Sequence, residues 1–355
     1  MSHLFTPLWL RDLESRNRVF VSPMCQYSSW EGFPSDWHLV HLGSRAVGGA
    51  GLVMMEATAV VSEGRISPMD MGLWSDEHAR ALERIPRFIK TQGAIPGIQL
   101  AHAGRKASVA PPFRGGRPVP PQEGGWEVRA PSDVPFGPGF ADPRPLAVDE
   151  IEALPEQFAA AARRALEAGF EVVEIHAAHG YLLHQFLSPI SNHRTDAYGG
   201  SFDARVRFPL AVVRAVRAAW SDRLPVFVRL SATDWVEGGW TLDDSIAFAR
   251  RLREEGVDLV DCSSGGLVPS AKIPNAPGYQ VPFAAAIKRE AAVATAAVGL
   301  ITSPEQAEQI VATGQADAVM MARELLRNPY WPLTAARRLG VQPSWPPQYE
   351  RARLR

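Results

Sequence analysis

The sequence has few cysteines, no long run of one charge and no long apolar stretch. Two cysteines among 355 residues are too few for a disulfide scaffold, an iron–sulfur cluster or a zinc site with four thiolates. With 37 basic and 38 acidic residues, nothing indicates a nucleic-acid groove or a membrane surface. No apolar stretch approaches the roughly 20 residues that span a bilayer, and the N-terminus lacks the layout of a signal peptide. We therefore expect a cytoplasmic protein with free thiols.

The sequence does contain a regular alternation of short apolar runs and helical patterns. Ile151, Leu154 and Phe158 recur at helical spacing, whereas Thr241 and Ser303 precede such patterns as helix N-caps do. The apolar runs have the continuous hydrophobicity of buried parallel strands. There are eight of them, at residues 19–22, 51–56, 95–100, 171–176, 225–230, 257–262, 292–299 and 316–321.

Eight strands that alternate with helices most simply close into a (β/α)8 TIM barrel, an α/β fold. An open doubly wound sheet would prefer a Gly-x-Gly-x-x-Gly turn after its first strand, but SPMCQY follows at 22–27. A bare barrel needs about 250 residues, so some segments are extra. We predict a single domain over 1–355 with an N-terminal hairpin, a lid loop after strand three at about 104–148, and a C-terminal tail at about 341–355.

Active sites of such barrels lie at the C-terminal ends of the strands, where this sequence has few carboxylates. A glycosidase would need two strand-end carboxylates; Glu56 and Glu174 are available, but no second acid is clearly paired with Glu174. His176 and His179 could serve a metal-dependent hydrolase, which is the alternative function. Such an enzyme needs three or more converging ligands, and no obligatory third ligand is evident, so we expect no metal. His184, further along the same segment, is assigned no chemistry.

The segments after strands seven and eight have the features of a phosphate site, which barrels often build there. Gly299 would let the backbone approach a phosphate closely. Arg323 would supply charge and a guanidinium fork.

Short segments on these strand ends carry a resemblance to a known family. They are SPMCQY (22–27), EATAV (56–60), QLAHAGRK (99–106), HAAHGY (176–181), SNHRTDAYGGS (191–201), RLS (229–231), GLITSP (299–304) and RELLRNP (323–329). In this order, from about residue 3 to 351, the chain resembles the old yellow enzymes. Within them it is similar to the thermophilic-like subgroup of FMN-dependent NADPH dehydrogenases and ene-reductases. Larger relatives carry an iron–sulfur cluster and further domains, which two cysteines and 355 residues do not fit.

The resemblance implies that FMN binds at the C-terminal ends of the barrel strands. Residues 22–25 and Ala57 would line the flavin, and Gln99 would bond its pyrimidine edge. Arg229 would lie near N1 and O2, where a fixed cation stabilises the anionic reduced flavin, while Gly299, Ala322 and Arg323 would hold the phosphate. The full set implied for FMN is Ser22, Pro23, Met24, Cys25, Ala57, Gln99, Arg229, Gly299, Ala322 and Arg323.

The resemblance also implies the reaction. NADPH (or NADH) would reduce the flavin, and an α,β-unsaturated carbonyl or nitro compound would reoxidise it in a ping-pong sequence. His176 and His179 would bind the substrate oxygen as an oxyanion hole does. Hydride would pass from flavin N5 to the β-carbon, and Tyr181 would protonate the α-carbon.

Three further residues are implied at the substrate pocket. Tyr27 would shape it, and Cys25 would lie beside the flavin and modulate its redox behaviour. Arg351 belongs to an end segment that resembles the part reaching into a neighbouring subunit's site. The chain is therefore expected to form a homodimer or homotetramer that acts on small molecules and binds neither nucleic acid nor membrane.

Overall fold

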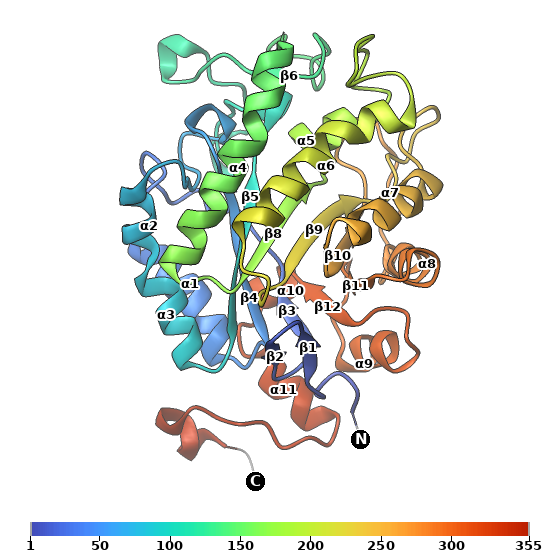
Figure 1. The fold of residues 1–355 in the computed structure, drawn as a ribbon. Coiled ribbons are helices and arrows are strands. Elements are labelled where there is room, and N and C mark those ends of the chain that lie inside the picture. Colours follow the sequence, from blue (N-terminus) through green and yellow to red (C-terminus); the bar gives the residue numbers. More distant parts are fainter. Residues whose placement is uncertain (1, 354–355) are drawn as a thin grey trace.

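Eight parallel strands form a closed barrel in the computed structural model, which describes residues 2–353 (Figure 1). Each strand overlaps one of the eight predicted apolar runs, so the predicted (β/α)8 barrel is confirmed. Around the barrel the strands are β3 (Val19–Val21), β4 (Leu52–Ala59), β5 (Ile95–Ala101), β8 (Val172–Ala177), β9 (Val226–Ser231), β10 (Leu259–Ser263), β11 (Ala294–Ala297) and β12 (Ala318–Met321).

The strands are apolar along their whole length because both of their faces are covered. Every residue of these eight strands except Ala294 is buried. Alternate side chains such as Phe20, Met54 and Phe227 form one core cluster, and their neighbours join a second cluster with the surrounding helices. Continuous hydrophobic runs are what strands covered on both faces require.

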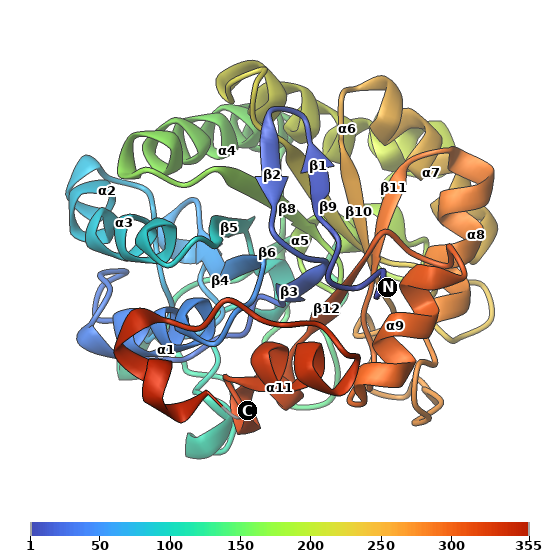
Figure 2. The same cartoon turned by 90° about the horizontal axis from the view of Figure 1, so that it is seen from below.

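An antiparallel hairpin of β1 (Leu8–Leu10) and β2 (Leu13–Ser15) lies across the N-terminal end of the barrel (Figure 2). Leu10 is buried with the inner strand cluster, and Leu8 and Leu13 pack against it. The predicted N-terminal hairpin is thus present, and its leucines close the barrel floor.

Helices connect the strands and cover the outside of the barrel. They are α1 (Asp36–Val47), α2 (Asp76–Leu82), α3 (Arg84–Thr91), α4 (Val148–Ala168), α5 (Leu182–Leu187), α6 (Phe202–Ala219), α7 (Leu242–Glu254), α8 (Val281–Ala291), α9 (Pro304–Ala312), α10 (Arg323–Arg327) and α11 (Trp331–Arg338). Both predicted N-caps are confirmed. Thr241 accepts from the Asp244 N–H at the start of α7, and Ser303 accepts from the Gln306 N–H at the start of α9.

The segment after β5 runs over the C-terminal ends of the strands, at the top of Figure 1. It contains three short 3-10 turns and two short paired strands, β6 (Arg129–Ala130) and β7 (Arg144–Pro145). Arg144 forms a two-point ion pair with Glu150 of α4, at 2.8 and 2.7 Å. This pair ties the end of the segment to the barrel wall.

The C-terminal segment lies at the other end of the molecule. Its 3-10 turn η5 (Pro347–Ala352) is at the bottom of Figure 1, beside the C label. Within residues 2–353, no helix combines the length and apolar character needed to cross a membrane.

Candidate active site

Three predicted catalytic side chains come together where β8 ends. His176 is the next-to-last residue of the strand, His179 lies in the following loop, and Tyr181 is the N-cap of α5. The His176 ring lies 5.2 Å from the His179 ring and 4.9 Å from the Tyr181 ring, centroid to centroid, both edge to face. The structure therefore groups two imidazoles and a phenol at the C-terminal end of one barrel strand.

The turn that carries His179 is held from every side. His179 and Gly180 both have left-handed backbones, with φ of +59° and +73°, a conformation that costs a non-glycine residue energy. Four side chains bind the backbone of these two residues. At His179, Ser231 accepts from the N–H (2.9 Å) and Lys106 donates to the carbonyl oxygen (2.8 Å). At Gly180, His184 accepts from the N–H (2.9 Å) and Gln185 donates to the carbonyl oxygen (2.7 Å). These bonds fix the strained turn in one position.

A backbone hydrogen bond indicates where the proton of the His176 imidazole lies. His176 Nδ1 accepts from the Ala178 N–H at 3.3 Å, so the proton of a neutral ring is on Nε2. His179 Nε2 lies 2.7 Å from Ser263 Oγ. Burial, and then the charge of Arg229, hold the pKa of both rings well below the ordinary value. Each histidine is therefore a neutral imidazole with one N–H.

Tyr181 remains a phenol over the physiological pH range. Burial, followed by the neighbouring Cys25 and Tyr27, raises its pKa well above the usual 10.0. Tyr181 and Cys25 pack against the same small apolar cluster as Ala57. Predicted substrate and cofactor residues from β4 and from the segments after β3 and β8 thus meet at one place.

The loop after β3 is anchored by the buried side chain of Glu56. Glu56 Oε2 accepts from the Gln26 N–H at 2.7 Å, and Glu56 Oε1 lies 3.0 Å from His38 Nε2. Cys25 and Tyr27 flank that anchored amide. Burial, then Asp70 and Glu56, raise the pKa of the Cys25 thiol well above its usual value, so it is uncharged.

Arg229 lies among buried polar groups inside the barrel. Gln99 donates to Glu174 at 2.7 Å, and Arg229 Nε lies 2.9 Å from Asp261 Oδ2. Burial and then Asp261 raise the pKa of Glu174 to about 8. The interpretation that no acid accompanies Glu174 is therefore wrong. The side chains of Glu174 and Asp261 are both 0% exposed, so they cannot bracket a sugar as glycosidase acids do.

A cavity of about 200 Å³ lies where β11 and β12 end, and Gly299, Ala322 and Arg323 line it. Gly299 has φ +119°, and a Cβ there would lie 2.8 Å from Gln280 Nε2, so a side chain would fill the cradle. Ala322 has φ −106° and ψ −95°, so it does not need the left-handed backbone that favours glycine. The cavity is also lined by the positive side chain of Arg327 and by Glu324. Its size and charge suit a phosphate group.

The remaining predicted residues lie in the loop after β3 or, in the case of Arg351, in the C-terminal segment. Ser22 donates its N–H to Met321 O at 3.0 Å, and its buried Oγ has no partner within residues 2–353. Pro23 and Met24 are half-buried beside it. Arg351 is exposed in η5 and is not brought to the histidines within one chain.

Sequence reasoning missed several groups that shape this site. These groups contact the turn or its supports. Lys106 and Ser231 lie within segments that carry the family resemblance, yet they had been assigned no role. Ser263 and Asp234 are common residue types with no distinguishing local pattern. The metal-dependent hydrolase required a cluster of three or more possible ligands. Residues 2–353 contain no such group of His, Cys, Asp and Glu.

Comparison with known proteins gives consistent matches. The model of the NADH:flavin oxidoreductase / NADH oxidase family matches residues 3–342. An NADPH dehydrogenase of Geobacillus sp. (strain WCH70) is 50% identical over 350 residues, which are 98% of each chain. A solved old yellow enzyme homologue from Zymomonas mobilis has a TM-score of 0.80 and 25% identity, with 97% of both chains covered.

A larger protein also matches. A solved 2-naphthoyl-CoA reductase complex has a TM-score of 0.85 and 27% identity over 96% of this chain. The match covers 52% of that protein, so the chain spans about half its length.

Proposed function

Since the chain belongs to the NADH:flavin oxidoreductase / NADH oxidase family, we propose that it reduces activated C=C bonds of α,β-unsaturated carbonyl or nitro compounds. FMN is its cofactor and NADPH its reductant, as in an NADPH dehydrogenase. The observation that carries the proposal is the pair of neutral imidazoles, His176 and His179, beside the protonated phenol of Tyr181.

The residues at the strand ends fit FMN. The unpartnered buried Ser22 Oγ and the cradle at Gly299 are features that a ligand with polar edges and a phosphate would use. Gln99 and Arg229 would bind the ring edge, with Pro23, Met24, Cys25 and Ala57 beside the ring. Gly299, Ala322 and Arg323 would hold the phosphate. The chemistry that FMN supplies when bound is hydride transfer, from NADPH and then to the β-carbon of the alkene, in a ping-pong sequence.

The two histidines bind the substrate oxygen. His176 offers the N–H at Nε2, because its Nδ1 is already an acceptor. Either group can be the donor in the 2.7 Å contact between Ser263 Oγ and His179 Nε2. In the proposed reaction the hydroxyl donates, which leaves Nδ1–H of that ring for the substrate. Two fixed donors polarise the alkene and stabilise the negative charge that develops on its oxygen.

Tyr181 completes the reaction as the general acid. Its high pKa keeps the proton on the phenol until the α-carbon becomes basic. Lys106 Nζ lies 5.1 Å from the centroid of the Tyr181 ring, and this cation favours the phenolate that remains after proton transfer. Tyr27 and Cys25 shape the opposite side, and the segment 104–148 acts as a lid over the pocket. Phe113 of that segment lies edge to face with Tyr27, 6.1 Å between centroids.

We also propose a cytoplasmic homodimer or homotetramer. The tail lies at the far end of its own barrel from the strand C-termini (Figure 1). Only a second copy could therefore bring Arg351 to an active site. Light scattering of the purified protein measures the number of subunits.

The function is tested with the purified protein under anaerobic conditions. The protein is expected to be yellow, to lose its flavin absorbance on addition of NADPH, and to regain it on addition of 2-cyclohexen-1-one with formation of cyclohexanone. A flavin that NADPH reduces but no enone or nitroalkene reoxidises would contradict the proposed substrate class.

A further inference from the structure

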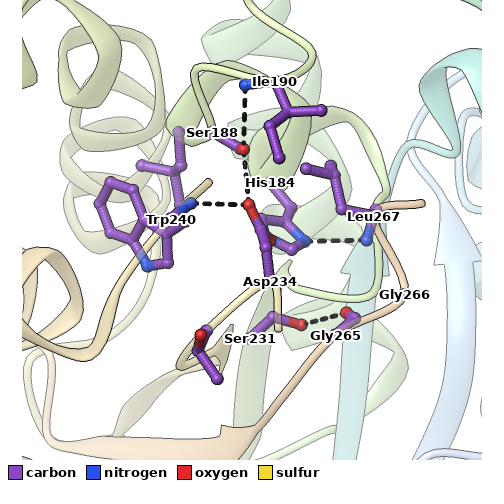
Figure 3. Close-up of polar contacts among 12 residues, drawn as sticks. His184, Ser188, Ile190, Ser231, Asp234, Trp240, Gly265, Gly266 and Leu267 are labelled. Atoms are coloured by element: carbon purple, nitrogen blue, oxygen red, sulfur yellow. Dashed lines mark hydrogen bonds and ion pairs between the residues drawn. The ribbon is translucent and has the colours of Figure 1, made fainter. Parts of the chain in front are cut away.

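Beneath the catalytic turn lies a second histidine–carboxylate pair that has no part in the proposed chemistry. His184 of α5 and Asp234, from the loop after β9, are both 0% exposed. His184 Nε2 lies 2.9 Å from Asp234 Oδ1, and Figure 3 shows Asp234 between Trp240 and His184. Neither atom has another partner within residues 2–353.

We propose that His184 and Asp234 are positioning residues. Asp234 holds His184 in the tautomer that accepts from the Gly180 N–H, and this bond sets the orientation of His179 and Tyr181. The inference rests on the proposed function, because it assigns these two residues a role in presenting the oxyanion donors and the general acid.

The tautomer follows from the bond to the backbone. Gly180 N–H donates to His184 Nδ1 at 2.9 Å. A ring nitrogen that accepts carries no proton, so the single proton of His184 is on Nε2. That N–H faces Asp234, at close range although not in full hydrogen-bond alignment.

The other side of Asp234 is fixed by two donors. Oδ2 accepts from the Ser188 hydroxyl at 2.6 Å and from the Trp240 N–H at 2.7 Å (Figure 3). A carboxylate only accepts, so its remaining oxygen requires the proton of His184 to be on Nε2. The carboxylate thereby selects the tautomer that leaves Nδ1 free for the turn.

The bond acts at the centre of the catalytic segment. Gly180 is the residue between His179 and Tyr181, and the backbone at Gly266 packs directly against it. A Cβ on Gly180 would lie 2.2 Å from Gly266 O, and a Cβ on Gly266 would lie 2.7 Å from His179 Cα. Loss of the Gly180–His184 bond would therefore shift both catalytic side chains relative to His176.

The test is Asp234→Asn. The Ser188 hydroxyl and the Trp240 N–H would continue to donate to one oxygen, which is now the amide oxygen of the new side chain. The amide NH₂ would therefore face His184 Nε2. The ring proton would then move to Nδ1, opposite the Gly180 N–H, and two donors would confront each other. Long-range ¹H–¹⁵N spectra of the histidine-labelled FMN complex report the tautomer directly. We expect Nε2–H for His184 in the wild type and Nδ1–H in the variant.

The functional readout is binding of p-hydroxybenzaldehyde, whose phenolate imitates the negative oxygen of the reaction. Its Kd, measured through the flavin spectrum, is expected to rise at least tenfold in Asp234→Asn with FMN content unchanged. His184→Asn retains an acceptor near the Nδ1 position and has no tautomer to reverse. The double variant His184→Asn/Asp234→Asn should therefore bind the phenol more tightly than Asp234→Asn alone.

Controls separate this role from simple loss of stability. Ile287→Val removes a buried methylene in α8, far along the chain from the turn, and should leave the Kd unchanged. If Asp234→Asn does not fold, the same reasoning predicts weaker phenol binding in His184→Leu than in His184→Asn. An unchanged tautomer, or additive effects in the double variant, would overturn the inference. Failure of enones to react would instead overturn the proposed function, and the tautomer result would still stand.

Discussion

At the scale of single residues, the site is built from groups that burial keeps uncharged. His176, His179, Tyr181 and Cys25 all have pKa values moved toward the neutral form, with burial as the first cause in each case. Neutral donors can stabilise a developing negative charge without first binding an anion from solution. This arrangement suits a substrate that is uncharged until hydride arrives.

Replacement of Tyr181 by Phe should separate the two half-reactions. The variant loses only the hydroxyl, so FMN binding and the rate of FMN reduction by NADPH should stay within a few-fold of the wild type. Reoxidation by 2-cyclohexen-1-one should slow by about 10²–10⁴-fold, the usual contribution of a general acid. Anaerobic stopped-flow measurement of each half-reaction checks this. Equal slowing of both steps would mean that Tyr181 positions ligands and does not donate the proton.

At the scale of elements, the turn between β8 and α5 joins parts of the chain that lie far apart in sequence. Lys106 Nζ donates both to His179 O (2.8 Å) and to Gly266 O (3.0 Å), which links the segments after β5, β8 and β10. Burial lowers the pKa of Lys106 to about 8. The turn therefore behaves as one cross-linked unit, and damage to it should affect catalysis more than FMN binding.

Gly180→Ala tests this view, with Gly200→Ala as its matched control. Both glycines have left-handed backbones, with φ of +73° and +79°, but a Cβ at Gly180 would meet Gly266 O at 2.2 Å whereas one at Gly200 meets nothing within 4 Å. The control should lose about 1–2 kcal/mol, the cost of left-handed backbone for alanine. Gly180→Ala should lose more and should also abolish enone reduction while retaining FMN. Urea denaturation and the enone assay distinguish the two variants, and similar behaviour of both would refute the argument.

The elements themselves were predictable from sequence, because their signals are local. Continuous apolar runs identified all eight barrel strands, and the caps at Thr241 and Ser303 marked two helix starts. The family followed from short segments on the strand ends, and the comparisons confirm it. The supports of the site were not predictable. Asp234 reaches His184 across 50 positions, a partnership that only the closed barrel creates, and Asp261 meets Glu174 in the same way.

At the scale of the whole molecule, a buried histidine and a buried aspartate make the free energy of unfolding depend on pH. Burial, then Arg45 and His38, lower the pKa of His41 in α1 to about 3. Burial raises the pKa of Asp70 to about 7. The two effects have opposite signs. The contribution of His41 is present above pH 6.5 and lost as the pH falls, whereas that of Asp70 is lost as the pH rises toward 7.

Comparison of the wild type with His41→Gln isolates one of these contributions, because Asp70 titrates alike in both proteins. Below pH 6.5 the unfolded chain gains a proton at His41 that the folded chain excludes. Between pH 6.5 and 4.5 the wild type should therefore lose about 2 kcal/mol more unfolding free energy than the variant. Urea denaturation of both proteins at the two pH values, at the same FMN concentration, measures the difference. An equal loss in both would mean that His41 is protonated in the fold, and that Arg45 and burial do not hold it neutral.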